Sequence, residues 1–118
     1  MRKSPSVPIL LAFAIAVSVL SARAQESANS LSIKNNSNFT ILELYVSRNG
    51  RDYWGPNLLG NNPLRPSQAF RLPNLAPGRY DLKLIDHDGY ACLKQMQVAG
   101  EVFLELTDES LLSCEGRR

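Results

Sequence analysis

Hydrophobic and polar residues alternate along most of six short stretches of the chain. The stretches are 31–34, 39–46, 68–72, 80–84, 92–98 and 102–106. Alternation places one side of a strand in a core and the other side in water, which is typical of antiparallel sheets. Segments rich in Asn, Asp, Gly and Pro separate the stretches and predict turns. The pattern therefore predicts an all-β fold, a small antiparallel β-sandwich of about 6–7 strands.

The alternation also predicts which side chains share a face. Stretch 39–46 is expected to place Leu42, Leu44 and Val46 on the core face. The last two stretches predict a hairpin, since residues 99–101 supply a three-residue loop with a glycine available for positive φ. The expected pairs across this hairpin are Val98 with Val102, Met96 with Leu104, and Lys94 with Leu106.

The first 24 residues have the three parts of a secretory signal peptide. Arg2 and Lys3 form a positive start, residues 7–20 are mostly apolar, and Ala22-Arg23-Ala24 is a small-x-small cleavage site. The apolar run is short for a membrane span. We expect a Sec-type signal peptide cleaved after Ala24, a periplasmic or secreted protein, and no stable membrane span after cleavage. An uncleaved membrane anchor is the alternative.

The remaining chain divides into a polar lead, a domain and a tail. Residues 25–30 are expected to be disordered, 31–114 to form the β-sandwich, and 115–118 to be a tail. Without residues 1–24 the chain has 10 basic and 11 acidic side chains (13 minus 3 Lys and Arg, against 11 Asp and Glu), a net charge of −1. This balance gives no electrostatic reason to expect a nucleic-acid partner.

The two cysteines, Cys92 and Cys114, are candidates for a disulfide. An exported protein meets an oxidising compartment, in which two cysteines usually pair. Two free thiols are the alternative. A metal-binding or catalytic cysteine is not expected, because the chain has no Cys-x-x-Cys motif and a single histidine, His87.

The segment at residues 48–60 breaks the alternation and is the candidate binding loop. It contains the single tryptophan of the chain, followed by a Gly-Pro pair and two leucines. One interpretation is that Trp54 closes an open end of the sandwich together with Leu58 and Leu59. The other is an exposed aromatic platform that stacks on a sugar or anchors a protein. The candidate binding residues are Arg48, Arg51, Asp52, Tyr53, Trp54 and Asn57.

Three runs, YVSRNGRDYWGPNLLG, LRPSQAFRL and GRYDLKLIDHDG, together resemble a family of small exported proteobacterial proteins. The family motif is Trp-x-x-Asp/Asn-Leu-Leu-Gly, and its members are labelled Tat-pathway signal protein or argininosuccinate lyase. The resemblance covers roughly residues 31–107 and implies a signal peptide with a compact β-domain, but no established activity. The chain has Pro66-Ser67 in place of the family's Pro-Gly turn. It also lacks both family cysteines, so no disulfide carries over.

Residues 86–89, Asp-His-Asp-Gly, are consistent with two interpretations. Asp86 and Asp88 weakly resemble part of a calcium loop, although the closing glutamate is missing. A hairpin turn needs no missing ligand, because Asp-Gly supplies the positive-φ positions. We favour the turn and expect no cofactor and no metal.

Catalytic signatures are absent from the sequence. The chain has no nucleophile elbow, phosphate-binding loop, dinucleotide fingerprint or zinc motif. The favoured hypothesis is an exported, non-catalytic binding or accessory protein of the bacterial cell envelope. Its partner would be an envelope protein or a glycan, met through residues 48–60. The alternative is a small periplasmic hydrolase or lyase with an unrecognised carboxylate site.

Overall fold

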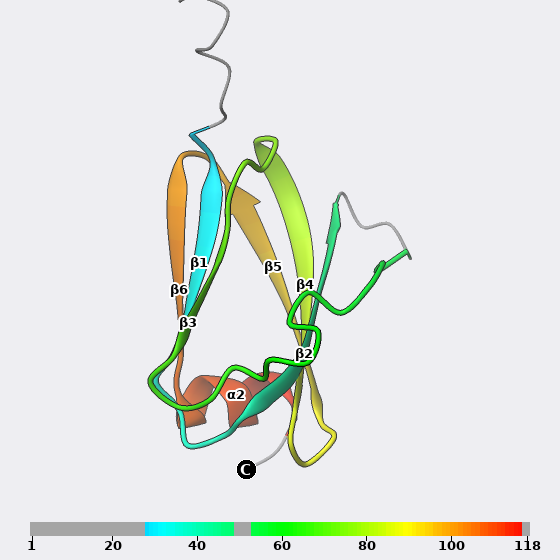
Figure 1. Cartoon of the computed structure of the whole chain (residues 1–118), viewed down its shortest axis with the longest axis vertical. Coiled ribbons are helices and arrows are strands. Elements are labelled where there is room, and N and C mark those ends of the chain that lie inside the picture. Colours follow the sequence, from blue (N-terminus) through cyan, green and yellow to red (C-terminus); the bar gives the residue numbers. More distant parts are fainter. Residues whose placement is uncertain (1–27, 49–52, 117–118) are drawn as a thin grey trace, which may run out of the picture.

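The computed structural model describes residues 28–48 and 53–116, which form two three-stranded sheets and one short helix (Figure 1). One sheet has the order β3-β1-β6 and the other β2-β4-β5. The strands are β1 (Ser30–Asn35), β2 (Ile41–Arg48), β3 (Ala69–Leu72), β4 (Gly78–Asp86), β5 (Ala91–Val98) and β6 (Glu101–Leu106). Helix α2 (Asp108–Cys114) follows β6. The predicted small all-β fold is confirmed.

The core lies between the two sheets, where the apolar side chains of the alternating strands meet. Leu31 and Ile33 of β1 and Leu82 and Leu84 of β4 are each at most 1 % exposed. Leu111 of α2 is fully buried and closes one end of the sandwich, where Figure 1 shows the helix lying across the strands. Tyr80 contributes its ring to the core and donates its hydroxyl proton to the carbonyl of Ala76.

The predicted hairpin of the last two strands is wrong. Residues 99–100 instead connect the two sheets, with Gly100 at φ +77°. The observed partners of β5 are on β4: Val98 with Gly78, Met96 with Tyr80, and Lys94 with Leu82. The observed partners of β6 are on β1 and run parallel: Val102 with Leu31, Leu104 with Ile33, and Leu106 with Asn35. The two strands present their apolar faces to the same core from opposite sheets.

A β-bulge corrects the predicted faces of β2. The register shifts between Ile41 and Glu43, so that Leu42 is the extra residue. Ile41 and Leu44 are buried, whereas Leu42 is 38 % exposed and does not belong to the core face. The bulge thus brings Ile41 into the core in place of Leu42, while Leu44 and Val46 keep their predicted core side and Glu43 and Tyr45 lie on the outer side.

The first strand begins one residue earlier than expected. Ser30 is 2 % exposed and lies in β1, and the Asn29 side chain accepts a hydrogen bond from the backbone of Gly100. Residues 29 and 30 are therefore part of the domain rather than of a disordered lead. The predicted signal peptide lies outside the described residues. Within residues 28–48 and 53–116, no helix is long and apolar enough to cross a membrane.

Candidate functional site

The outer face of the β2-β4-β5 sheet carries the candidate site. The strand register aligns its outward side chains in rows across the sheet. One row is Tyr45, Lys83 and Leu93, and the next is Ser47, Asp81 and Gln95. The intervening side chains of β4 point into the core, so the sequence alternation alone turns Asp81 and Lys83 outward.

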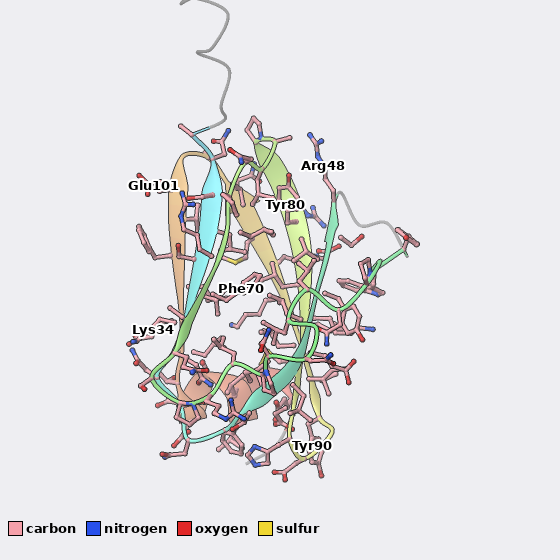
Figure 2. All side chains as sticks on the ribbon, viewed as in Figure 1. Lys34, Arg48, Phe70, Tyr80, Tyr90 and Glu101 are labelled. Atoms are coloured by element: carbon pink, nitrogen blue, oxygen red, sulfur yellow. A yellow bond between two sulfur atoms is a disulfide. The ribbon has the colours of Figure 1, made fainter. Side chains whose placement is uncertain are left out.

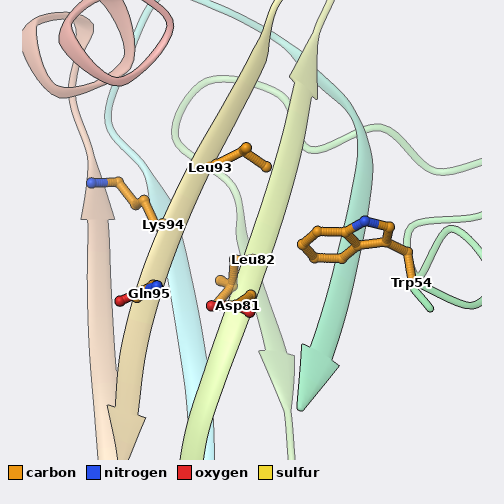
Figure 3. Close-up of a pocket in the computed structure, with 6 residues that line it drawn as sticks. All are labelled: Trp54, Asp81, Leu82, Leu93, Lys94 and Gln95. Atoms are coloured by element: carbon orange, nitrogen blue, oxygen red, sulfur yellow. The ribbon is translucent and has the colours of Figure 1, made fainter. Parts of the chain in front are cut away.

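Trp54 lies against this outer face (Figure 3). The amine Nζ of Lys83 is 5.1 Å from the centre of the Trp54 ring and 5.0 Å from the centre of the Tyr45 ring. A cation between two aromatic rings is attracted by the negative face of each, which helps to hold Trp54 beside the sheet. Trp54 is half-buried, whereas its neighbour Tyr53 is 78 % exposed.

One interpretation of the sequence expected Trp54, Leu58 and Leu59 to close the sandwich together, but the structure places them in different surroundings. Leu59 is 6 % exposed and belongs to the core, and Leu58 packs against the core. Trp54 lies on the outer face of the sheet instead. Its position therefore matches neither a plug at the end of the sandwich nor a fully exposed platform.

A groove of about 450 Å³ lies beside Trp54. Its lining residues are Trp54, Asp81, Leu82, Leu93, Lys94 and Gln95. The Lys94 side chain points to the opposite side of the sheet from Trp54, as expected from its pairing with the buried Leu82 (Figure 3). Trp54, Asp81, Leu93 and Gln95 therefore give the groove one aromatic ring, one aliphatic side chain, one carboxylate and one amide.

Asp81 provides an unusual hydrogen-bond acceptor in this groove. Its Oδ1 atom is buried and has no hydrogen-bond partner among the residues that the structure describes. A buried polar atom without a partner costs free energy, roughly 1–3 kcal/mol.

Asn57 has a structural role rather than facing a ligand. Its Oδ1 accepts hydrogen bonds from the backbone N–H groups of Leu44 at 2.9 Å and of Leu59 at 3.0 Å. Its Nδ2 donates to the carbonyls of Leu42 and Gly60. Asn57 therefore fastens the segment after Trp54 to the edge of β2.

The other predicted loop residues lie apart from the groove or outside the described residues. Arg48, at the end of β2, donates to the carbonyl of Pro77 and does not line the groove. It lies at the opposite end of the sheet from Tyr90 (Figure 2). Arg51 and Asp52 lie outside the described residues. Of the predicted binding residues that the structure describes, Trp54 alone lines the groove, and the sequence did not indicate its neighbours Asp81, Leu93 and Gln95.

Tyr45 and Glu43 form a hydrogen-bonded pair next to the Lys83 amine. The hydroxyl of Tyr45 donates to Oε1 of Glu43. This hydrogen bond, with smaller contributions from burial and from the negative charge of Glu43, raises the pKa of Tyr45 above its ordinary value of 10.0. A raised pKa favours the neutral phenol in the folded state. The resulting stability is complete below the unfolded pKa and is lost as the pH rises through the folded pKa.

We therefore expect Glu43→Gln to lower the pKa of Tyr45 towards 10.0. The substitution removes the negative charge and weakens the acceptor of the tyrosine proton. A pH titration of phenolate absorbance measures the change, and Tyr45→Phe identifies which of the four tyrosines titrates last. An unchanged titration in Glu43→Gln would contradict the assigned cause.

The predicted disulfide between Cys92 and Cys114 is present, with a Cα–Cα distance of 5.1 Å. It joins β5 to α2 and is consistent with an oxidising compartment. The predicted hairpin register, continued past Lys94 and Leu106, would place Cys92 opposite Asp108. This is wrong, because Cys92 pairs with Leu84 of β4. Helix α2 was not predicted. It turns the chain and brings Cys114 back to β5.

Asp86 and Asp88 lie in the turn between β4 and β5. The carboxylate Oδ1 of Asp86 accepts hydrogen bonds from the backbone N–H groups of Asp88 and Tyr90, and Gly89 has φ +86°. The Asp86 carboxylate thus holds the hairpin turn. Among the described residues, no group of three or more His, Cys, Asp or Glu side chains could hold a metal ion.

The sequence matches neither a known protein family nor a curated protein. The resemblance to the small exported proteobacterial family therefore stays a prediction.

Proposed function

We propose that this chain is an exported, non-catalytic binding domain of the bacterial cell envelope and that the groove beside Trp54 takes a saccharide. The observation that carries the proposal is the meeting of the Trp54 ring and the Asp81 carboxylate in one groove. Known ligand pockets combine apolar walls with a few placed polar groups, and a volume of about 450 Å³ is within their usual range.

A sugar ring has the two surfaces that this groove would complement. Its axial C–H groups carry partial positive charge and are attracted by the negative face of an aromatic ring, while Leu93 adds an apolar contact. Its hydroxyl groups donate and accept hydrogen bonds at the rim. The Asp81 carboxylate would accept from one hydroxyl, and the Gln95 amide can both donate and accept. An envelope glycan supplies this chemistry.

The disulfide and the predicted signal peptide support the envelope location. A disulfide persists in oxidising compartments such as the periplasm. The proposal assigns no catalytic step. The groove offers one carboxylate among its lining residues, whereas the carboxylate chemistry of most glycoside hydrolases uses two.

Saccharide binding should change the fluorescence of Trp54, the single tryptophan of the chain. The purified protein is titrated with N-acetylglucosamine oligomers, glucose oligomers and soluble peptidoglycan fragments. We expect a saturable change with at least one of these classes. Calorimetry with the same saccharide should show affinity reduced by about tenfold or more in Trp54→Ala and in Asp81→Asn.

Phe103→Ala is the matched control, because Phe103 is an exposed aromatic residue on the other sheet. Its saccharide affinity should equal that of the parent protein. The proposal is wrong if no saccharide binds, or if binding is unchanged in both Trp54→Ala and Asp81→Asn. Capture of an envelope protein by the parent but not by Trp54→Ala would assign the groove to a protein partner instead.

A further inference from the structure

Strand β6 leaves one edge of its sheet without a partner. Among the described strands, β6 pairs with β1 alone. The N–H of Ser30 donates to the carbonyl of Gly100, and the N–H of Asn36 donates to the carbonyl of Leu106. Even-numbered residues of β6 therefore face β1 with their backbone groups. In a parallel pair the alternate residues direct their N–H and C=O groups to the other side, so Glu101, Phe103 and Glu105 present them at the open edge.

The same three residues present their side chains on the outer face of the sheet. Phe103 is 74 % exposed and lies between Glu101 and Glu105, both of which are exposed. Figure 2 shows Glu101 at the outer side of β6. A groove of about 390 Å³ runs beside this row, lined by Phe103 and Glu105 together with β1 residues such as Ser32. Unpaired backbone groups along an edge are a template for pairing with another strand, and Phe103 adds an apolar contact at the centre of this edge.

The charges at this edge are available to a partner. Within the described part of the chain, neither glutamate forms an ion pair with a lysine, an arginine or the histidine. Glu105 accepts one hydrogen bond from Nδ2 of Asn36 at 2.6 Å. The nearest strand neighbour of Glu105 with a positive charge, Lys34, donates its amine to the carbonyl of Ser67 instead.

The edge of β2 in the other sheet is covered over its first half, Ile41 to Leu44. The N–H of Leu58 donates to the carbonyl of Leu44, and Asn57 Oδ1 accepts the N–H of Leu44. The edge of β5 carries no charge on its outer face, where Ala91, Leu93, Gln95 and Gln97 lie. Among these edges, only β6 combines open backbone groups, an exposed ring and a pair of like charges.

The like charges disfavour a second copy of the chain as the partner. Antiparallel pairing of two β6 strands centred on Phe103 would place Glu101 of one copy opposite Glu105 of the other at both ends. Like charges directly opposite each other in a sheet are destabilising. The two glutamates thus disfavour pairing with a second β6 strand, and they attract a strand that carries positive charge.

We propose that the β6 edge adds a strand from a partner protein, in which an apolar residue faces Phe103 and a lysine or arginine two residues away on each side faces Glu101 and Glu105. Main-chain hydrogen bonds to the three open residues would provide affinity, and the two charge pairs would set specificity and register. This surface lies on the opposite sheet from the Trp54 groove, so the two sites are independent.

A labelled synthetic peptide tests the proposal with the full-length protein. The peptide has a central valine, a lysine two residues away on each side, and threonines elsewhere. We expect saturable binding by fluorescence anisotropy. A peptide with glutamates in place of the lysines should bind at least about tenfold more weakly. A lysine peptide methylated on the backbone nitrogens that face β6 should lose binding, because strand addition needs those N–H groups.

Two charge-matched variants locate the site. Glu101→Lys should weaken binding of the lysine peptide, whereas Glu109→Lys, an exposed glutamate on α2, should leave it unchanged. Phe103→Ala should also weaken binding, with the melting temperature of each variant close to that of the parent. The proposal is overturned if the lysine peptide does not bind, if backbone methylation has no effect, or if both charge variants behave alike.

Discussion

Replacing both Cys92 and Cys114 by alanine should lower the free energy of unfolding by about 3 kcal/mol. The two cysteines are 22 residues apart in the sequence, and the disulfide between them restricts the unfolded chain. In a domain of this size that loss corresponds to a fall in melting temperature of about 12–24 °C. A thermal melt of the double variant measures the change, and the parent protein in reducing agent should behave like the variant.

Helix α2 should be the first part of the fold to respond. It spans seven residues, which is too short for a helix to be stable alone. The capping box of Thr107 and Ser110 closes its first turn. The buried Leu111, the disulfide and the two hydrogen bonds from Asn38 to the Asp108 carboxylate hold it to the rest of the fold. Limited proteolysis of the double variant should therefore cut near α2 before it cuts the strands.

Ser113→Ala is the control for this experiment, because Ser113 is an exposed residue of the same helix. Its melting temperature should lie within about 1–2 °C of that of the parent. Substitutions of exposed residues that take no part in a core, a helix cap or a disulfide change the free energy of unfolding little. If the double cysteine variant has the same melting temperature as the parent, the disulfide contributes no stability beyond that of the contacts of Leu111, and the prediction is wrong.

The alternation of apolar and polar residues predicted the strands well but could not assign them to sheets. Both β5 and β6 face the core, so a hairpin within one sheet and a connection between two sheets have the same pattern. What decides between them is β1, whose Leu31 and Ile33 lie opposite Val102 and Leu104. That pairing is parallel and distant in sequence, and the local pattern carries no signal for it.

Other differences have local causes. The bulge at Leu42 inserts one residue into β2, and nothing in the sequence marks that position with glycine or proline. Helix α2 is shorter than the stretch in which a helical period can be recognised, although Thr107 followed by Asp108 and Glu109 is a usable helix-start signal.

The candidate site was predicted in part. The unusual composition of residues 53–60 identified Trp54 correctly as a residue outside the strand pattern. The alternation also predicted that the side chains of Asp81 and Lys83 lie on the outer face of the sheet. The meeting of Trp54 with Asp81 depends on how the segment lies along the edge of β2, which is tertiary information. Asn57 was named as a binding residue because it lies in the candidate loop at 48–60, but its side chain accepts a hydrogen bond from the backbone of β2.

Asn35→Ala should strongly destabilise the fold, lowering the free energy of unfolding by about 3–5 kcal/mol. The sequence suggests an ordinary turn at 35–38, yet Asn35 is fully buried. Its Nδ2 donates to the carbonyls of Phe39 at 2.8 Å and Leu64 at 2.9 Å. Its Oδ1 accepts from the backbone N–H and the hydroxyl of Ser37.

The cost is large because one side chain serves several buried groups at once. Removing the amide leaves the N–H of Ser37 without its acceptor and takes one hydrogen bond each from the Ser37 hydroxyl and the carbonyls of Phe39 and Leu64. These carbonyls keep their bonds from the Ser37 hydroxyl and the Ile41 N–H. Each lost hydrogen bond costs about 0.5–1.5 kcal/mol, and a buried unsatisfied group costs roughly 1–3 kcal/mol. Asn36→Ala is the matched control, since Asn36 is exposed and its side chain donates to Glu105 at the surface. It should lose less than about 1 kcal/mol.

Urea unfolding of the two variants gives the comparison. The m-value of each should stay near that of the parent, since the surface exposed on unfolding is the same. Asn35→Ala should unfold at a much lower urea concentration than Asn36→Ala. If the two midpoints coincide, water replaces the amide of Asn35, and the corner that joins β1 to residues 64–68 is held by its backbone bonds from Asn35 to Ser67 and Gln68. A wide separation would instead establish the Asn35 amide as the group that fixes this corner.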